Sequence, residues 1–195
     1  GCADNEHNTL YITGSYIGTD KLGITASPNG GNGIYYQIHR AIAYSVVGGQ
    51  LSAERNIISG NGKNGILLRR PDYTFGTVAV INSYIGVNVV GATAVGNTLS
   101  GIATEDSPGS LSGLGLEIGN NLGFAGAPLP PTSADRNVIS GNGAHGISSN
   151  TTNVQFSIKN SYIGTNAGGT SDLGNALDGI KLFATGNADI QIGGS

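Results

Sequence analysis

Short runs in which apolar and polar residues alternate recur along the whole chain. Each run spans five residues, carries an apolar side chain at its third position and ends in Gly or Asn. The runs cover residues 10–14, 45–49, 78–82, 116–120, 156–160 and 190–194. Alternation with a period of two predicts a short β-strand that buries one face.

Two further elements follow each of the first five runs in a constant order. The first is a pair of apolar residues, at Tyr16-Ile17, Ile57-Ile58, Tyr84-Ile85, Val138-Ile139 and Tyr162-Ile163. The second is Gly-Ile, which begins at Gly33, Gly65, Gly101, Gly146 and Gly179. From Ile12 to Ile192 the chain covers 180 residues in five such rounds, or 36 residues per round.

Three short strands per round predict an all-β fold, a right-handed parallel β-helix of about five three-sided turns with no capping helix. A single turn cannot bury its own apolar face, so the core forms only when turns stack at about 4.8 Å. Handedness follows from the crossover preference of parallel strands. The expected inward columns are Ile12, Val47, Val80, Ile118, Ile158 and Ile192 on one wall and Ile34, Ile66, Ile102, Ile147 and Ile180 on another.

The corner after each alternating run carries only two residue types. They are Gly14, Gly49, Asn82, Asn120, Asn160 and Gly194. Gly and Asn are the residues that tolerate positive φ, so a left-handed corner explains the restriction.

Loop lengths alternate between turns, so the sequence repeat is two turns long. We expect residues 1–195 to form one β-helix domain, or a segment of a longer one, with two-turn repeats starting near residues 8, 76 and 153. The largest loop covers 121–136 and contains Pro128, Pro130 and Pro131, which a regular strand excludes.

The repeated motifs resemble a known class of sequence. Asn-x-Ile-Ser-Gly-Asn-Gly-x-x-Gly-Ile occurs at 56–66 and 137–147, and it alternates with Ser-Tyr-Ile-Gly-Thr. Together they are similar to the right-handed parallel β-helix repeats of large secreted and surface-anchored bacterial proteins. This resemblance implies the fold and an extracellular or cell-surface location. Pectate lyases, glycoside hydrolases, adhesins and phage tailspikes share the architecture, so it selects no activity.

Composition narrows the classes of partner. The net charge is −3 with scattered basic residues, which argues against a nucleic-acid partner. No apolar run reaches the ~20 residues that a membrane span needs. The single cysteine, Cys2, excludes an internal disulfide and a cysteine-rich metal site.

No constellation of residues indicates catalysis, a cofactor or a metal. Glu105 and Asp106 are adjacent and therefore point to opposite faces of a strand. Asp172 and Asp178 share one loop and could approach each other, and His145 reads as a surface turn residue. The sequence thus predicts a chain that is not an enzyme, with a polysaccharide lyase or glycoside hydrolase as the alternative.

Two surfaces are candidates for binding. If Ile is the inward member of each apolar pair, the outward stripe comprises Tyr16, Ile57, Tyr84, Val138 and Tyr162. Either the long loops fold over this stripe or it is an exposed interface for a partner. The second candidate is a sugar-contact set of Tyr35, Tyr36 and Tyr73, which would serve a carbohydrate-binding or carbohydrate-cleaving module.

The sequence favours a non-catalytic structural or adhesive role, as a stalk, a fibre subunit or a segment of a surface protein. The chain starts and stops in repeat register, without a cap. The expected partners are copies of itself stacked end to end or adjoining repeats of a longer parent chain, and a polysaccharide is a further candidate.

Overall fold

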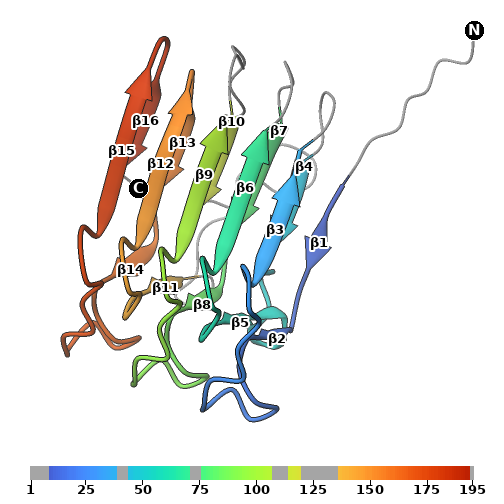
Figure 1. The fold of residues 1–195 in the computed structure, drawn as a ribbon, viewed down its shortest axis with the longest axis vertical. Helices are drawn as coiled ribbons and strands as arrows, with labels where there is room; N and C mark the ends of the chain where they lie inside the picture. The colour runs from blue at the N-terminus through green and yellow to red at the C-terminus, as the bar shows by residue number, and fades with distance from the viewer. Residues whose placement is uncertain (1–8, 39–43, 71–75, 107–113, 120–135, 194–195) are drawn as a thin grey trace, which may run out of the picture.

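The chain folds into a three-sided parallel β-helix (Figure 1). A computed structural model describes residues 9–38, 44–70, 76–106, 114–119 and 136–193. Within these ranges the single helical segment is the 3₁₀ turn η1 (Ser52–Glu54), and no described helix has the length and apolar character to cross a membrane. The all-β solenoid that the sequence predicts is therefore confirmed.

Three parallel sheets form the walls, and we name them by their place in Figure 1. The back sheet contains β1 (Tyr11–Ile12), β4 (Tyr44–Val47), β7 (Gly76–Val80), β10 (Leu114–Ile118), β13 (Gln155–Ile158) and β16 (Asp189–Ile192). The base sheet contains β2 (Tyr16–Ile17), β5 (Asn56–Ile58), β8 (Ser83–Ile85), β11 (Asn137–Ile139) and β14 (Ser161–Ile163). The front sheet contains β3 (Ile34–Gln37), β6 (Ile66–Arg70), β9 (Ile102–Asp106), β12 (Ile147–Thr152) and β15 (Ile180–Thr185).

The register places like residues on top of one another. Ile12 pairs with Val47 and Ile34 with Ile66, and both columns continue through the stack as the sequence predicts. Ile17, Ile58, Ile85, Ile139 and Ile163 form the matching column of the base sheet. The three columns meet in one core cluster, because a period of two sends every second side chain inward.

The corner between the back and base sheets uses a left-handed residue, whose position alternates from turn to turn. Positive φ occurs at Gly14, Asn82 and Asn160. In the intervening turns it occurs one residue earlier, at Gly48, Gly119 and Gly193. The assignment of this role to Gly49 is therefore wrong, because Gly48 carries it with φ of 109°. Asn120 and Gly194 lie outside the described residues, as do 121–135 of the predicted large loop.

Glycine precedes the first Ile of each front-sheet strand because neighbouring turns approach closely there. A Cβ added to Gly101 would lie 2.8 Å from the carbonyl oxygen of Gly146, and Gly33, Gly65 and Gly146 are confined in the same way. At separations below 3.0 Å the neighbouring atoms must shift, and that shift is costly when the obstacle is backbone. This column of glycines therefore lets the turns reach hydrogen-bonding distance.

A ladder of asparagine side chains runs beside the glycines, at the corner between the base and front sheets. The ladder comprises Asn29, Asn61, Asn97, Asn142 and Asn175, and the Nδ2 of each of the first four donates to the Oδ1 of the next, at 2.8–2.9 Å. The amides also satisfy buried backbone groups, as when Asn97 Nδ2 donates to the Ile58 carbonyl at 3.0 Å. The ladder explains the second Asn of the repeated motif, because each side chain bonds both neighbouring turns.

Candidate functional site

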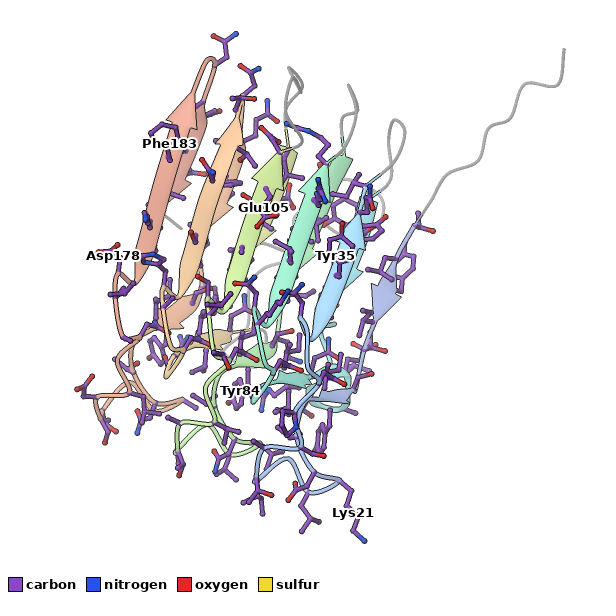
Figure 2. The ribbon with its side chains drawn as sticks, in the orientation of Figure 1. Lys21, Tyr35, Tyr84, Glu105, Asp178 and Phe183 are labelled. Atoms are coloured by element: carbon purple, nitrogen blue, oxygen red, sulfur yellow. The ribbon has the colours of Figure 1, made fainter. Side chains whose placement is uncertain are left out.

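The long loops cover the apolar stripe of the base sheet. Ile57, Tyr84 and Val138 are buried in a second cluster, against which Val89, Ala167 and Leu173 of the loops pack. Figure 2 shows Tyr84 between the base sheet and the loops below it. Of the two readings of this stripe, burial by the loops is therefore the correct one over most of its length.

Two arginines close the stripe further. The guanidinium of Arg55 lies 4.2 Å from the ring centroid of Tyr84, and that of Arg136 lies 4.2 Å from the ring centroid of Tyr162. Tyr16, in the first turn, remains 44% exposed. An interface running along the whole stripe is thus ruled out, since three of its five side chains are interior.

The predicted sugar-contact tyrosines do not share a surface. Tyr35 points outward from the front sheet and is 50% exposed (Figure 2). Tyr36, its neighbour in β3, points inward, where it packs against the core and its hydroxyl accepts a 3.1 Å hydrogen bond from Ser45. The pairing of these two residues is wrong because adjacent strand residues face opposite ways. Tyr73 lies outside the described residues.

The other polar candidates have structural partners. His145 is buried rather than a surface residue, and its Nδ1 lies 3.2 Å from the backbone nitrogen and 3.1 Å from Oδ2 of Asp178. Asp172 instead accepts a hydrogen bond from the backbone of Gly174 in its own loop. Glu105 is exposed on the front sheet (Figure 2).

Asp106 points the other way and pairs with a buried arginine. Its Oδ1 accepts a 2.8 Å hydrogen bond from Arg70, whose side chain is fully buried, and its Oδ2 accepts two from Thr152. Burial lowers the pKa of Arg70, and the carboxylate of Asp106 opposes that shift. With Thr152, this pair joins three turns of the front sheet.

A cleft of about 500 Å³ opens on the outer face of the back sheet. It extends over β7, β10, β13 and β16, and its floor is lowest at Gly115, which has no side chain between Thr77 and Gln155. Besides Gly115, the lining includes two apolar residues, Phe156 and Ile190, and six polar ones. The polar residues are Thr77, Glu117, Gln155, Ser157, Asp189 and Gln191.

Glu117 is a half-buried acid of the cleft. Burial raises its pKa above the ordinary 4.5, and a hydrogen bond with Tyr44 partly offsets the shift. The Tyr44 hydroxyl reaches across β7 and lies 3.4 Å from Glu117 Oε2. Burial, and then the charge of Glu117, raise the pKa of Tyr44 as well, so its hydroxyl remains a donor.

Ser157 lies beside Glu117 in register, and its hydroxyl oxygen is buried without a hydrogen-bond partner among the described residues. An unsatisfied buried hydroxyl costs about 1–3 kcal/mol. A bound group could supply the missing bond once the Ser157 side chain turns toward the cleft.

The two carboxylates of the cleft are widely spaced. Asp189 lies two strands from Glu117 and two residues out of register, which separates their Cα atoms by about 12 Å. Their side chains stand on the same sheet face and roughly perpendicular to it. Carboxyl groups in glycoside hydrolases lie about 5–9.5 Å apart, so this arrangement suits hydrogen bonding to a ligand better than hydrolysis.

Sequence reasoning missed this cleft, although one signal was present. A glycine inside an alternating run, as at Gly115 between Leu114 and Leu116, often marks a close approach of a ligand or another backbone.

Comparisons with models of protein families, with curated proteins and with solved structures find no match for this chain.

Proposed function

We propose that this chain is a non-catalytic structural or adhesive β-helix of an extracellular or cell-surface assembly. It would be right-handed, like the secreted and surface-anchored bacterial repeats that its sequence resembles. The observation that carries the proposal is the continuity of the stacked contacts, in which each turn bonds its neighbours through three sheets and one asparagine ladder.

Such contacts suit an element that has to keep its shape under load. In a solenoid each turn contacts only its neighbours, so length and stiffness grow as turns are added. The buried amides of Asn61, Asn97 and Asn142 add directional bonds to the hydrophobic stacking. The low charged content, 11% of residues, fits a surface whose stability depends little on salt.

The terminal turns suggest how further units would join. The ladder runs in one direction, from Oδ1 of Asn29 to Nδ2 of Asn175, so its two ends carry complementary groups. The back sheet has six described strands and the other two sheets have five. If a second copy stacked end to end and continued all three sheets, its β1 would therefore take the position that β16 occupies.

Two measurements test this role. Antibodies against the chain should label intact producing cells or their secreted material without permeabilisation. The purified chain should release neither reducing ends nor unsaturated products from polysaccharides. Turnover that falls in Glu117→Gln but not in Glu105→Gln, an exposed acid of the front sheet, would overturn the proposal.

The form of the assembly is measured separately. Sedimentation velocity at rising concentration, combined with electron microscopy, distinguishes filaments of stacked copies from single particles. Filaments would identify the chain itself as the partner, and single particles would favour adjoining turns.

A further inference from the structure

We infer that the cleft on the outer face of the back sheet binds a neutral oligosaccharide, held by the hydroxyl and carboxamide groups around Gly115. This site is independent of the structural role, since an adhesive or inert scaffold can carry it equally. The argument rests on the shape of the cleft, the chemistry of its side chains and their charge.

The shape suits an extended ligand. The cleft crosses four parallel strands, so its long direction follows the axis of the helix. Its volume of about 500 Å³ lies within the range of about 300–1,000 Å³ that small-molecule sites occupy. Gly115 provides the depth, and a side chain there would meet the Thr77 hydroxyl, 2.7 Å from an added Cβ.

The lining side chains match the chemistry of sugar hydroxyls. A carboxamide both donates and accepts hydrogen bonds, as does a hydroxyl. Gln155 and Gln191 supply two carboxamides, and Thr77 and Ser157 supply two hydroxyls. Sugar hydroxyls have the same dual character, so each can bond two of these groups at once.

Ser157 gives this surface a specific anchor. Its buried oxygen has no partner within the described part of the chain, although it lies on the outer face at the cleft. Water-exposed hydroxyls cost nothing when left without a protein partner, whereas buried ones do. Because the oxygen is covered in this structure, a ligand hydroxyl reaches it only after the Ser157 side chain turns toward the cleft, and the new hydrogen bond then satisfies the group.

The charge of the cleft selects among oligosaccharides. Glu117 and Asp189 are acidic, and none of the described lining residues is Lys or Arg. A chain of uronic acids would bring like charges together, and its carboxylates would have no cation to pair with. Neutral sugars meet only acceptors and donors, so they are favoured over acidic sugars.

The test is calorimetric titration of the full chain with hexamers of defined sugars. Cellohexaose, maltohexaose and mannohexaose are the neutral probes, and hexagalacturonate and the chitosan hexamer are the charged ones. We expect at least one neutral hexamer to bind, and to bind more tightly than hexagalacturonate. Absence of binding by all three neutral probes, or a preference for either charged probe, would overturn the inference.

The substitution Ser157→Ala separates binding from folding. Removing a buried hydroxyl that has no partner should leave the stability unchanged or raise it. It should also weaken binding about 2- to 10-fold, the value of one hydrogen bond. Ser148→Ala is the matched control, because Ser148 is also half-buried and points outward, but from the front sheet.

Two further variants guard against a misleading result. Gln155→Ala should weaken binding by a similar factor, and Gly115→Val should abolish it by filling the floor. Folding of each is checked by its β-sheet circular dichroism. If the parent chain, Ser157→Ala and Gln155→Ala bind the sugar with equal affinity, the sugar binds elsewhere and the proposed site is refuted. Surface labelling and the absence of turnover would still support the structural role.

Discussion

Replacing Asn97 by Ala tests how much the asparagine ladder contributes to the fold. Asn97 occupies the middle of the ladder and is 1% exposed. Its Oδ1 accepts hydrogen bonds from the side chain and the backbone nitrogen of Asn61, at 2.8 and 3.1 Å. Its Nδ2 donates to the Ile58 carbonyl at 3.0 Å and to Asn142 Oδ1 at 2.9 Å. The substitution therefore removes four hydrogen bonds.

The expected loss of unfolding free energy is about 3–5 kcal/mol. Each bond contributes about 1 kcal/mol net, and a buried group left without a partner costs more. Three of the abandoned groups keep other partners: Asn61 Nδ2 still donates to Ser59, the Ile58 carbonyl still accepts from Gly86, and Asn142 Oδ1 still accepts from the Asn97 backbone. Only the backbone N–H of Asn61 is left buried without a partner, so we expect a loss of unfolding free energy near the middle of this range.

Urea unfolding, monitored by circular dichroism, measures the loss of unfolding free energy, provided that the slope of the transition is unchanged. Asn29→Ala is the matched control, because Asn29 ends the same ladder, is exposed, and donates one bond to Asn61. We expect the Asn29→Ala variant to lose less than about 1 kcal/mol of unfolding free energy. Since a solenoid can unfold in parts, hydrogen exchange at the Asn61 amide should show the same order locally. Equal midpoints for the two variants would refute the reasoning.

Asn97→Asp adds a signature that depends on pH. The new carboxyl keeps the acceptor but turns its other oxygen toward the Ile58 carbonyl and Asn142 Oδ1, two acceptors. Burial and these neighbours raise the pKa of the acid in the folded state above its unfolded value of about 3.9. Stability should thus be highest below that value and fall as pH rises through the folded pKa, a dependence that Asn97→Ala lacks.

Three further substitutions have defined outcomes. Gly101→Ala should cost several kcal/mol in urea unfolding because the new Cβ meets the Gly146 carbonyl, whereas Gly30→Ala, with open space around it, should change the midpoint little. Because burial raises the folded-state pKa of Glu117, the stability of the parent chain falls as pH rises past the unfolded value. Glu117→Gln lacks this fall, so it should be more stable than the parent chain above pH 4.5 and equally stable below it. Equal pH profiles of the two chains would contradict this. Hydrogen bonds from Thr25 and the loop backbone lower the pKa of Asp20, so this residue makes the parent chain less stable on acidification below pH 3.8. Asp20→Asn should fold normally and lack this contribution to the pH dependence. Calorimetric melting over acidic pH measures the difference.

Much of the fold could be predicted from residue order because its rules are local. A period of two determines which residues face inward, so the columns that start at Ile12 and Ile34 required no knowledge of distant contacts. Gly or Asn at a corner reports positive φ, though the sequence could not tell Gly48 from Gly49 when both were present. Alternation also separates Tyr35 from Tyr36, and the sugar-contact set failed where that rule was not applied.

The remaining features depend on which residues meet across turns. Whether the stripe at Tyr84 is exposed depends on how the loops two turns apart pack on each other, as the hydrogen bond from Val89 N to the Gly23 carbonyl shows. The Asn ladder requires five side chains at one corner with a single direction of donation, and the sequence spacing between them varies from 32 to 45 residues. The repeated sequence therefore determines the walls and corners of this β-helix, because strand alternation and backbone φ are properties of neighbouring residues. Loop coverage, the ladder and the cleft at Gly115 were decided only by the tertiary structure, because each is made by residues that stacking alone brings together.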